Sequence, residues 1–190
     1  MNTTIFDTPI LNTLLQRSAH SLFKLFGWQT AGTLPATPKY VIIAAPHTSN
    51  WDFALAMGIA FAYRIKVYWM GKHTLFRWPF GYVARWLGGI AVERSASHNL
   101  VAHTVEQFRQ RDALIIGIPP EGTRKQVAQW KTGFYHIAQQ AQVPIVLGYF
   151  DYEHKIVGFG PTFTPTGDLE RDLAEIRAFY APLKGRTPSQ

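Results

Sequence analysis

The chain of 190 residues contains no cysteine, which excludes a disulfide framework, a cysteine nucleophile and a thiolate metal site. Charged residues are also few, at 16%, while hydrophobic residues reach 47%, a composition that excludes a disordered polar chain. No apolar run approaches the roughly 20 residues of a membrane-spanning helix, and the longest covers only residues 53–63. A Walker-type phosphate loop is absent, so a P-loop nucleotide enzyme is excluded as well.

Positive charge exceeds negative charge, because 19 Lys and Arg residues face 12 Asp and Glu residues, for a formal net charge of +7. Such a surplus attracts nucleic acids, anionic lipid headgroups or phosphorylated cofactors. Aromatic residues make up 14% of the chain, which suits large apolar ligands or a membrane surface. The first residues lack the basic region of a secretory signal. We therefore expect a cytoplasmic protein, either dissolved or peripheral on the inner face of the cell membrane.

Short apolar runs alternate with segments of helical periodicity along most of the chain. We expect strands at 41–45, 65–70, 89–92, 114–118 and 145–150, a hairpin partner at 155–159, a helix beginning near Trp51, and helices at 80–87, 97–109, 133–142 and 169–180. Strands that alternate with helices indicate a sheet covered on both faces. The predicted fold class is therefore α/β, a single domain with a mostly parallel sheet flanked by helices.

Residues 1–39 are expected to form an N-terminal amphipathic helix and a linker ahead of the main domain at 40–190. Apolar residues recur at helical spacing over 10–26, and the linker at 31–39 contains two prolines and a glycine. The apolar stripe has two interpretations, packing on the core or lying in a membrane surface, and both hold if part of it stays exposed. The predicted membrane contacts are Leu22, Phe23, Leu25, Phe26 and Trp28.

Two loops at predicted strand ends carry reactive side chains, and ligands bind α/β sheets beyond the carboxyl ends of the strands. In the first loop, His47 follows the strand at 41–45 and Asp52 falls in the first turn of the next helix. Across such a turn the carboxylate can accept the imidazole N–H, which fixes the tautomer and leaves the other nitrogen basic. The alternative is that Asp52 only favours the helix dipole and His47 is a surface residue.

The second loop follows the strand at 114–118. Gly122 permits an unusual backbone turn and close approach of a ligand. Thr123 and Arg124 offer donors to an anion, and Arg grips phosphate in two places. Glu121 either orders Arg124 or accepts from a substrate hydroxyl. An exposed turn with an ion pair of little energetic value is the alternative. A third segment, residues 88–95, contains Arg94 and gives only a weak signal by itself.

In their order along the chain, these segments resemble the glycerolipid acyltransferase family, and in particular the bacterial 1-acyl-sn-glycerol-3-phosphate acyltransferases. The matching segments are His47-x4-Asp52 and residues 89–94, 120–124 and 143–146. The resemblance implies a glycerol-3-phosphate acyltransferase-like fold. It also implies that His47 takes the proton of an acceptor hydroxyl, that Asp52 orients His47, and that the hydroxyl attacks the thioester without an acyl-enzyme. It assigns acceptor headgroup binding to Arg94, Glu121, Gly122, Thr123 and Arg124.

The same resemblance implies two substrates, an acyl thioester and a lysolipid, with acyl-CoA or acyl-carrier protein as donor and no resident cofactor or metal. Pro46, Glu93 and Lys125 replace residues that are commoner in the family, namely Asn, Asp and Ser. These changes lie beside substrate-facing positions. The acceptor therefore stays open between 1-acyl-sn-glycerol-3-phosphate and another lysolipid or an amino-acid-based lipid.

Two other classes of protein fit the composition less well. A basic nucleic-acid-binding module remains a remote alternative, because no recognised binding motif is present and the basic residues are scattered. We therefore expect no nucleic-acid partner. A metal hydrolase would need ligands on one face, but His98 and His103 are five residues apart on one predicted helix and there is no His-Glu-x-x-His motif.

Overall fold

Seven strands form one sheet, in the order β1-β7-β6-β2-β5-β3-β4, in the part of the chain that the computed structural model describes, residues 3–92, 97–123 and 129–186. The strands are β1 (Gln29–Ala31), β2 (Lys39–Ala45), β3 (Val67–Lys72), β4 (Gly89–Val92), β5 (Leu114–Ile118), β6 (Ile145–Asp151) and β7 (Ile156–Phe163). The five neighbouring strands β6, β2, β5, β3 and β4 are parallel to one another. Strand β7 is antiparallel to β6, and β1 is parallel to β7. The predicted α/β fold with a mostly parallel sheet is confirmed.

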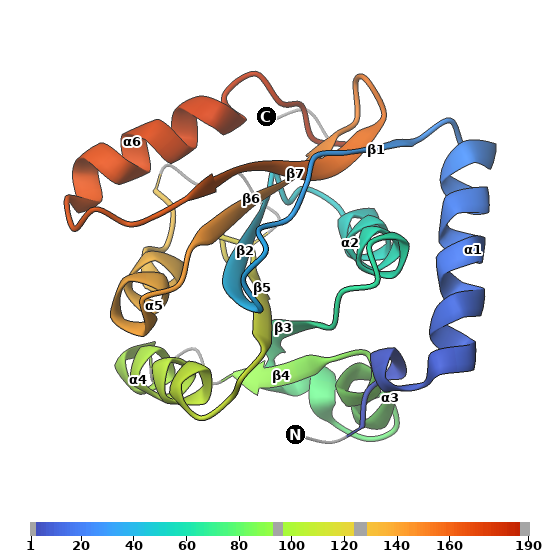
Figure 1. Cartoon of the computed structure of the whole chain (residues 1–190), viewed down its shortest axis with the longest axis horizontal. Helices are drawn as coiled ribbons and strands as arrows, with labels where there is room; N and C mark the ends of the chain where they lie inside the picture. The colour runs from blue at the N-terminus through green and yellow to red at the C-terminus, as the bar shows by residue number, and fades with distance from the viewer. Residues whose placement is uncertain (1–2, 93–96, 124–128, 187–190) are drawn as a thin grey trace.

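Helices cover both faces of the sheet (Figure 1). They are α1 (Pro9–Leu25), α2 (Trp51–Ala62), α3 (Gly81–Trp86), α4 (Ser97–Arg109), α5 (Gly133–Ala141) and α6 (Leu169–Tyr180), with short 3-10 helices η1 (Ile5–Asp7) and η2 (His73–Phe76). Helices α1, α2 and α3 lie on one side of the sheet, and α4, α5 and α6 lie on the other (Figure 1). Within the described ranges, no helix is both long enough and apolar enough to cross a bilayer.

Strand β2 shows how the sheet separates two hydrophobic cores. Val41 and Ile43 belong to the core beneath α5 and α6, while Tyr40 and Ile42 belong to the core beneath α1 and α2. Successive side chains of a strand point to opposite faces, so a strand covered on both faces must be apolar at every position. The continuous apolar run that predicts this strand therefore reflects burial on both faces of the sheet.

The predicted helices and strands match the observed elements, with shifts of about two residues at some ends and a longer β7. Strand β1 is not predicted, because a three-residue strand is too short to carry a periodic pattern. It pairs in parallel with β7, from Gln29 opposite Ile156 to Ala31 opposite Gly158. The hairpin expected between 145–150 and 155–159 is present as β6 and β7.

Helix α1 packs on α2, and this packing corrects one predicted membrane contact. Phe23 is only 8% exposed, and its ring lies so close to Gly58 of α2 that a Cβ there would come within 2.8 Å of it. Phe23 is therefore a core residue and wrong as a lipid contact. Trp28 is half-buried, with its ring edge-on to Tyr152 and the centroids 5.0 Å apart. The predicted contacts that do stay exposed are Leu22, Leu25 and Phe26.

Candidate active site

The carboxyl ends of β2, β5 and β6 lie side by side, because β2 pairs in parallel with both β5 and β6. The loop after β2 carries His47, the loop after β5 carries Glu121, and the turn after β6 carries Tyr152. Three segments far apart in the sequence thus place polar side chains at one edge of the sheet, where α/β proteins bind ligands.

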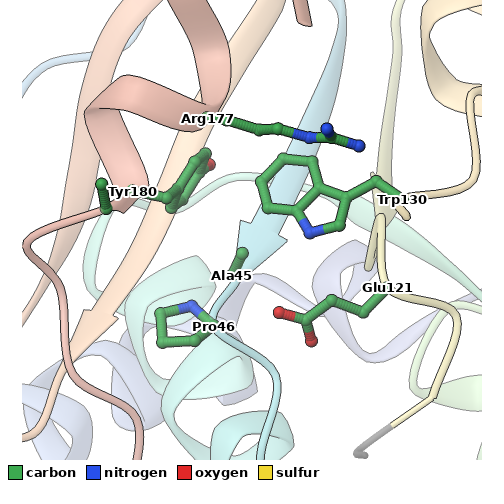
Figure 2. A pocket seen from close by; sticks show the side chains of 7 residues that line it. Ala45, Pro46, Glu121, Trp130, Arg177 and Tyr180 are labelled. Atoms are coloured by element: carbon green, nitrogen blue, oxygen red, sulfur yellow. The ribbon is translucent and has the colours of Figure 1, made fainter. Parts of the chain in front are cut away.

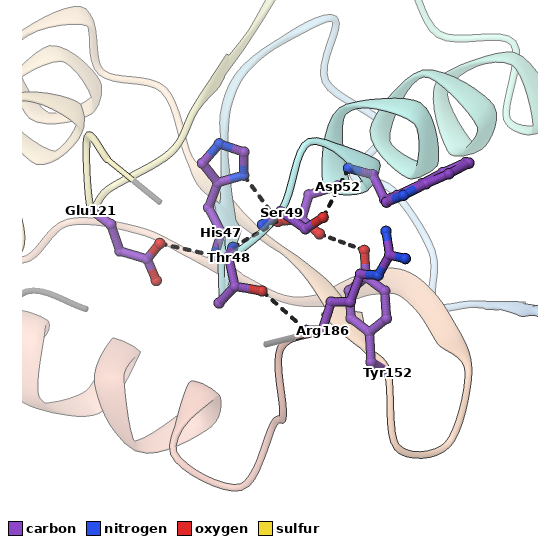
Figure 3. A network of polar contacts seen from close by, with 8 residues as sticks. His47, Thr48, Ser49, Asp52, Glu121, Tyr152 and Arg186 are labelled. Atoms are coloured by element: carbon purple, nitrogen blue, oxygen red, sulfur yellow. Dashed lines mark hydrogen bonds and ion pairs between the residues drawn. The ribbon is translucent and has the colours of Figure 1, made fainter. Parts of the chain in front are cut away.

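His47 and Asp52 form a direct pair across the turn from β2 into α2 (Figure 3). The ring atom Nδ1 of His47 lies 3.2 Å from Oδ2 of Asp52. The same oxygen accepts the backbone N–H groups of Thr48 at 2.7 Å and Ser49 at 2.8 Å. Asp52 is only 1% exposed, so its carboxylate is the buried centre around which this loop folds. The structure therefore brings together the two residues that the sequence singles out as a base and its orienting group.

The surroundings of Asp52 favour its ionised form. Burial raises the pKa of this carboxyl, but hydrogen bonds from the His47 ring, the Tyr152 hydroxyl and the N–H groups of Ser49 and Thr48 outweigh burial and hold the pKa below its usual value. The ionised carboxylate accepts a hydrogen bond from Nδ1–H of His47, which leaves Nε2 of the ring free to accept a proton. His47 also lines the large cavity described below, so this basic nitrogen belongs to a ligand-accessible site.

Tyr152 is a member of the site that the sequence reasoning missed. Its hydroxyl donates to Oδ1 of Asp52 at 2.5 Å, across 100 residues of sequence (Figure 3). Burial and the neighbouring carboxylate raise the pKa of Tyr152 far above its ordinary value, so it remains a hydrogen-bond donor at neutral pH. Its position two residues after the predicted strand at 145–150 is the one signal that could have identified it.

Glu121 supports the same loop from the other side. Its Oε2 accepts the backbone N–H of His47 at 2.8 Å, which fixes the start of the loop after β2 (Figure 3). Burial raises the pKa of Glu121 above its usual value, and the nearby Asp52 adds to this, while the His47 N–H opposes it. The predicted partner of Glu121 in its own loop, Arg124, lies outside the described residues, as does Arg94.

The backbone after Glu121 turns sharply at Gly122, which has a φ of +65°. A Cβ at Gly122 would lie 3.0 Å from the side chain of Lys131, which packs against it. The N–H of Lys131 donates to the carbonyl of Pro120 at 2.8 Å, so the two ends of the loop are held together. Thr123 is exposed. Gly122 thus adopts the unusual backbone turn that the sequence predicts, a left-handed conformation that glycine takes up without steric cost.

A cavity of about 800 Å³ opens beside His47, between α2 and the sheet. Small residues form part of its sheet side, because Ala44 of β2, Gly117 of β5 and Gly148 of β6 leave the space unfilled. Other apolar residues that line it are Phe53, Ala56 and Met57 of α2 and Leu75, Phe80 and Val83 around η2 and α3. The arrangement can therefore hold a long apolar chain with one end at the His47–Asp52 pair.

A second, smaller cleft of about 280 Å³ has Glu121 in its wall. Figure 2 shows Arg177 of α6 lying over the indole of Trp130, with Pro46 and Glu121 on the opposite side of the cleft. The guanidinium carbon of Arg177 is 5.8 Å from the ring centroid of Trp130. This cleft thus offers a cation for an anionic group, and it shares none of its lining residues with the apolar cavity. The sequence gives no signal for Arg177, which is one of several charged residues on α6.

Residues 184–186 hold the loop after β2 and the turn after β6 in place. The backbone N–H of Arg186 donates to Oγ1 of Thr48 at 3.0 Å, and its guanidinium lies over the ring of Trp51 at 5.2 Å (Figure 3). The N–H of Tyr152 donates to the carbonyl of Lys184 at 3.0 Å. The residues around His47 are therefore fixed by contacts from three separate parts of the chain, which favours a preorganised site.

Residues 29–147 match the family model described as Acyltransferase. No curated protein matches the chain at a significant level. Among solved structures, the crystal structure of the 1-acyl-sn-glycerophosphate (LPA) acyltransferase PlsC from Thermotoga maritima is similar to this chain, with a TM-score of 0.64 and 16% sequence identity. The similarity covers 94% of this chain and 82% of that protein. At this level of identity it shows a shared fold.

Proposed function

The chain belongs to the acyltransferase family, and we propose that it transfers a fatty acyl group from an acyl thioester to a hydroxyl of a lysophospholipid-like acceptor. The observation that carries this proposal is the position of the His47–Asp52 pair at the wall of the apolar cavity. A base with a buried orienting carboxylate supplies the proton transfer, and the cavity supplies room for an acyl chain. Neither feature requires a covalent acyl-enzyme.

In the proposed reaction, Nε2 of His47 takes the proton from the acceptor hydroxyl as its oxygen attacks the thioester carbonyl carbon. A C–O bond forms, and the tetrahedral intermediate collapses with cleavage of the C–S bond. The leaving thiolate then takes the proton from the imidazolium of His47. Asp52 stays ionised and stabilises the imidazolium through Nδ1. The products are an ester and a free thiol, and the proposed reaction uses no resident cofactor.

The proposed donor is acyl-CoA or an acylated carrier protein. The acyl chain would lie between α2 and the small residues of the sheet, with the thioester at the His47 end of the cavity. Both donors share this thioester and chain, and differ in the large group beyond the sulfur atom. They are therefore separated by assay with each donor in turn.

The proposed acceptor is 1-acyl-sn-glycerol-3-phosphate, the substrate in the name of the Thermotoga maritima protein. The cleft with Glu121 and Arg177 supports an acceptor that carries both a hydroxyl and an anionic group. The sequence adds Arg94 and Arg124 as proposed headgroup ligands. The same chemistry on another lysolipid or an amino-acid-based lipid is the second candidate, because Pro46 lines the cleft where many family members have Asn.

We also propose that the protein meets these poorly soluble substrates as a peripheral protein on the anionic inner face of the cell membrane. The net charge of +7 supports attraction to anionic lipid, since each basic residue near such a surface contributes about 1 kcal/mol. This attraction is screened by salt.

The proposed function is tested by incubating the purified protein with radiolabelled acyl-CoA or acyl-carrier protein and a panel of acceptors. The panel contains 1-acyl-sn-glycerol-3-phosphate, lysophospholipids with other headgroups, and an amino-acid-based lipid. We expect labelled diacyl product from 1-acyl-sn-glycerol-3-phosphate. Product only from another acceptor would move the assignment to the second candidate, and no transfer to any acceptor with either donor would contradict the proposed function.

A further inference from the structure

An exposed apolar surface follows the third strand of the sheet. It consists of Leu75, Trp78, Phe80, Tyr82, Val83 and Trp86, in and around η2 and α3, and is called the α3 patch here. Trp78 is 84% exposed and Tyr82 is 76% exposed, which is unusual for aromatic side chains of this size. Six large apolar side chains within twelve residues form a concentrated patch of the kind that marks an interaction surface.

The α3 patch is presented by a firmly held segment. Beneath it Phe76 is buried, and its ring lies 5.7 Å from that of Trp69. Arg85 donates to the carbonyls of Phe76 at 3.3 Å and Gly81 at 3.2 Å. A Cβ at Gly81 would lie 2.1 Å from the Phe76 carbonyl oxygen, so the close approach of η2 and α3 requires glycine. The segment therefore packs through Phe76 and holds its other aromatic residues outward.

The charge around the α3 patch has one sign. Residues 53–92 contain five Lys and Arg and no Asp or Glu, and three of these basic residues, Lys72, Arg77 and Arg85, are exposed within or beside the patch. All the large exposed hydrophobic residues in the described part of the chain fall between Ile10 and Trp86, in the same basic half. Trp and Tyr among basic residues are typical of surfaces that lie at the interface of an anionic bilayer.

The α3 patch also forms part of the wall of the large cavity. Leu75, Phe80 and Val83 are exposed and line this cavity, which His47 also lines. The exposed residues of α1, including Leu25 and Phe26, do not line it. The α3 patch and His47 therefore border one and the same cavity, much of whose lining is apolar.

We propose that the α3 patch, and not the N-terminal helix, is the principal membrane contact, that it inserts at the surface of an anionic bilayer, and that acyl chains enter the cavity through it. The entry of acyl chains through the α3 patch rests on the proposed function, whereas the membrane contact of the patch does not. Partial insertion of Trp78, Phe80 and Tyr82 places the cavity wall at the level of the lipid. Lys72 and Arg77 are then positioned for anionic headgroups.

The contact is tested by cosedimentation of the full chain with vesicles that contain phosphatidylglycerol. The variant carries Trp78→Ser and Tyr82→Ser, because neither residue lines the cavity. The matched control carries Leu25→Ser and Phe26→Ser, which removes two exposed apolar side chains from the end of α1. We expect the first variant to bind about tenfold or more weakly, from the lost apolar burial, and the control to bind nearly as the parent chain. Full binding by the first variant, or loss confined to the control, would overturn the proposal.

A second measurement remains decisive even if the double variant folds poorly. Lipids brominated on the acyl chain quench only tryptophans that reach them, so the Trp78→Phe variant should show clearly less quenching than the parent chain. Unchanged quenching would overturn the proposal. Both measurements are independent of turnover. Absence of transfer by the parent chain to acceptors below their micelle concentration would instead count against the proposed function. The double variant should keep this transfer while losing activity on vesicle-borne acceptor.

Discussion

The hydroxyl of Tyr152 lies 2.5 Å from Oδ1 of Asp52, while Nδ1 of His47 lies 3.2 Å from Oδ2 of the same carboxylate. The two carboxylate oxygens of the buried Asp52 thus have different partners. One accepts from Tyr152, in the turn after β6, and the other faces the ring of His47, the proposed base. Tyr152 acts on the site through Asp52 and is a positioning residue. It also lowers the pKa of that carboxyl, as one of four hydrogen-bond donors that outweigh the effect of burial.

Replacing Tyr152 by Phe removes this donor and keeps the ring that packs on Trp28. We expect kcat to fall about tenfold or more with little change in KM, since a hydrogen bond to a charged group contributes roughly 1.5–3 kcal/mol. The pKa of Asp52 should rise, because burial then meets less opposition. The carboxylate, without this donor, attracts the imidazolium of His47 more strongly, so the acid limb of the pH–rate profile should move to higher pH. A variant with reduced kcat and an unmoved profile would show that Tyr152 is only structural.

Gly117 offers a way to shorten the cavity without disturbing the sheet. A Cβ at this position would meet Val67 at 3.6 Å and the Tyr68 carbonyl at 3.7 Å, which are ordinary contacts. Gly117→Val should fold and reduce the volume available to the acyl chain. We expect activity with long acyl donors to fall several-fold while short donors are affected less, measured as kcat/KM across a donor series. An equal loss for all chain lengths would argue against chain binding beside β5.

Arg177 lines the cleft that is proposed to bind the acceptor headgroup. Arg124 is the residue that the sequence identifies for the same headgroup-binding role. Alanine at either position should raise the KM for a phosphate-bearing acceptor about tenfold or more, and should leave the KM for the donor nearly unchanged. Lysine at either position should restore only part of the loss, because it cannot grip phosphate in two places. Equal weakening toward donor and acceptor would show that the arginine is structural.

Asp172, in the first turn of α6, accounts for part of the acid sensitivity that we expect. It accepts from the Tyr135 hydroxyl and from both N–H and Oγ1 of Thr166, each at 2.7 Å. Burial raises its pKa, but these hydrogen bonds hold the pKa below the ordinary 3.8. Its stabilisation is therefore present above that value and is lost as the pH falls through the lower folded-state pKa.

Asp172→Asn should be less stable at neutral pH, by about 1–3 kcal/mol, and should lose less stability than the parent chain on acidification. Urea unfolding at pH 7 and pH 3 measures both quantities. A parallel decline of the two proteins with pH would contradict this account of Asp172.

Local features of the sequence predict much of the fold. Strands such as β2 and β5 are continuous apolar runs because helices cover both faces of the sheet, and burial on both faces favours apolar residues along the whole strand. The His47–Asp52 pair is also predictable, since only a short turn separates the two residues. The pattern on α1 does not distinguish Phe23 from Leu25, because the side that meets α2 depends on Gly58 of another helix.

The rest of the site depends on contacts between distant parts of the chain. Tyr152 reaches Asp52 because β6 lies beside β2. Arg177 joins the cleft because the end of α6 is held against these two strands, where the Tyr180 hydroxyl donates to backbone carbonyls of both. Neither pairing has a local pattern. The α3 patch is visible in the sequence as an aromatic segment, but its exposure and its place at the cavity wall require the fold.

The central claim is that His47 is the general base of acyl transfer, and its most direct test is single-turnover transfer from labelled acyl-CoA or acyl-carrier protein by the parent chain and by His47→Ala. A positioned base contributes ~10²–10⁴-fold in rate, so we predict a loss of that size. Circular dichroism and binding to anionic vesicles, as controls, should be unchanged. Asp52→Asn should also be severely impaired, because the imidazole loses its orienting charge. Transfer by a folded His47→Ala variant at nearly the parent rate would contradict the account.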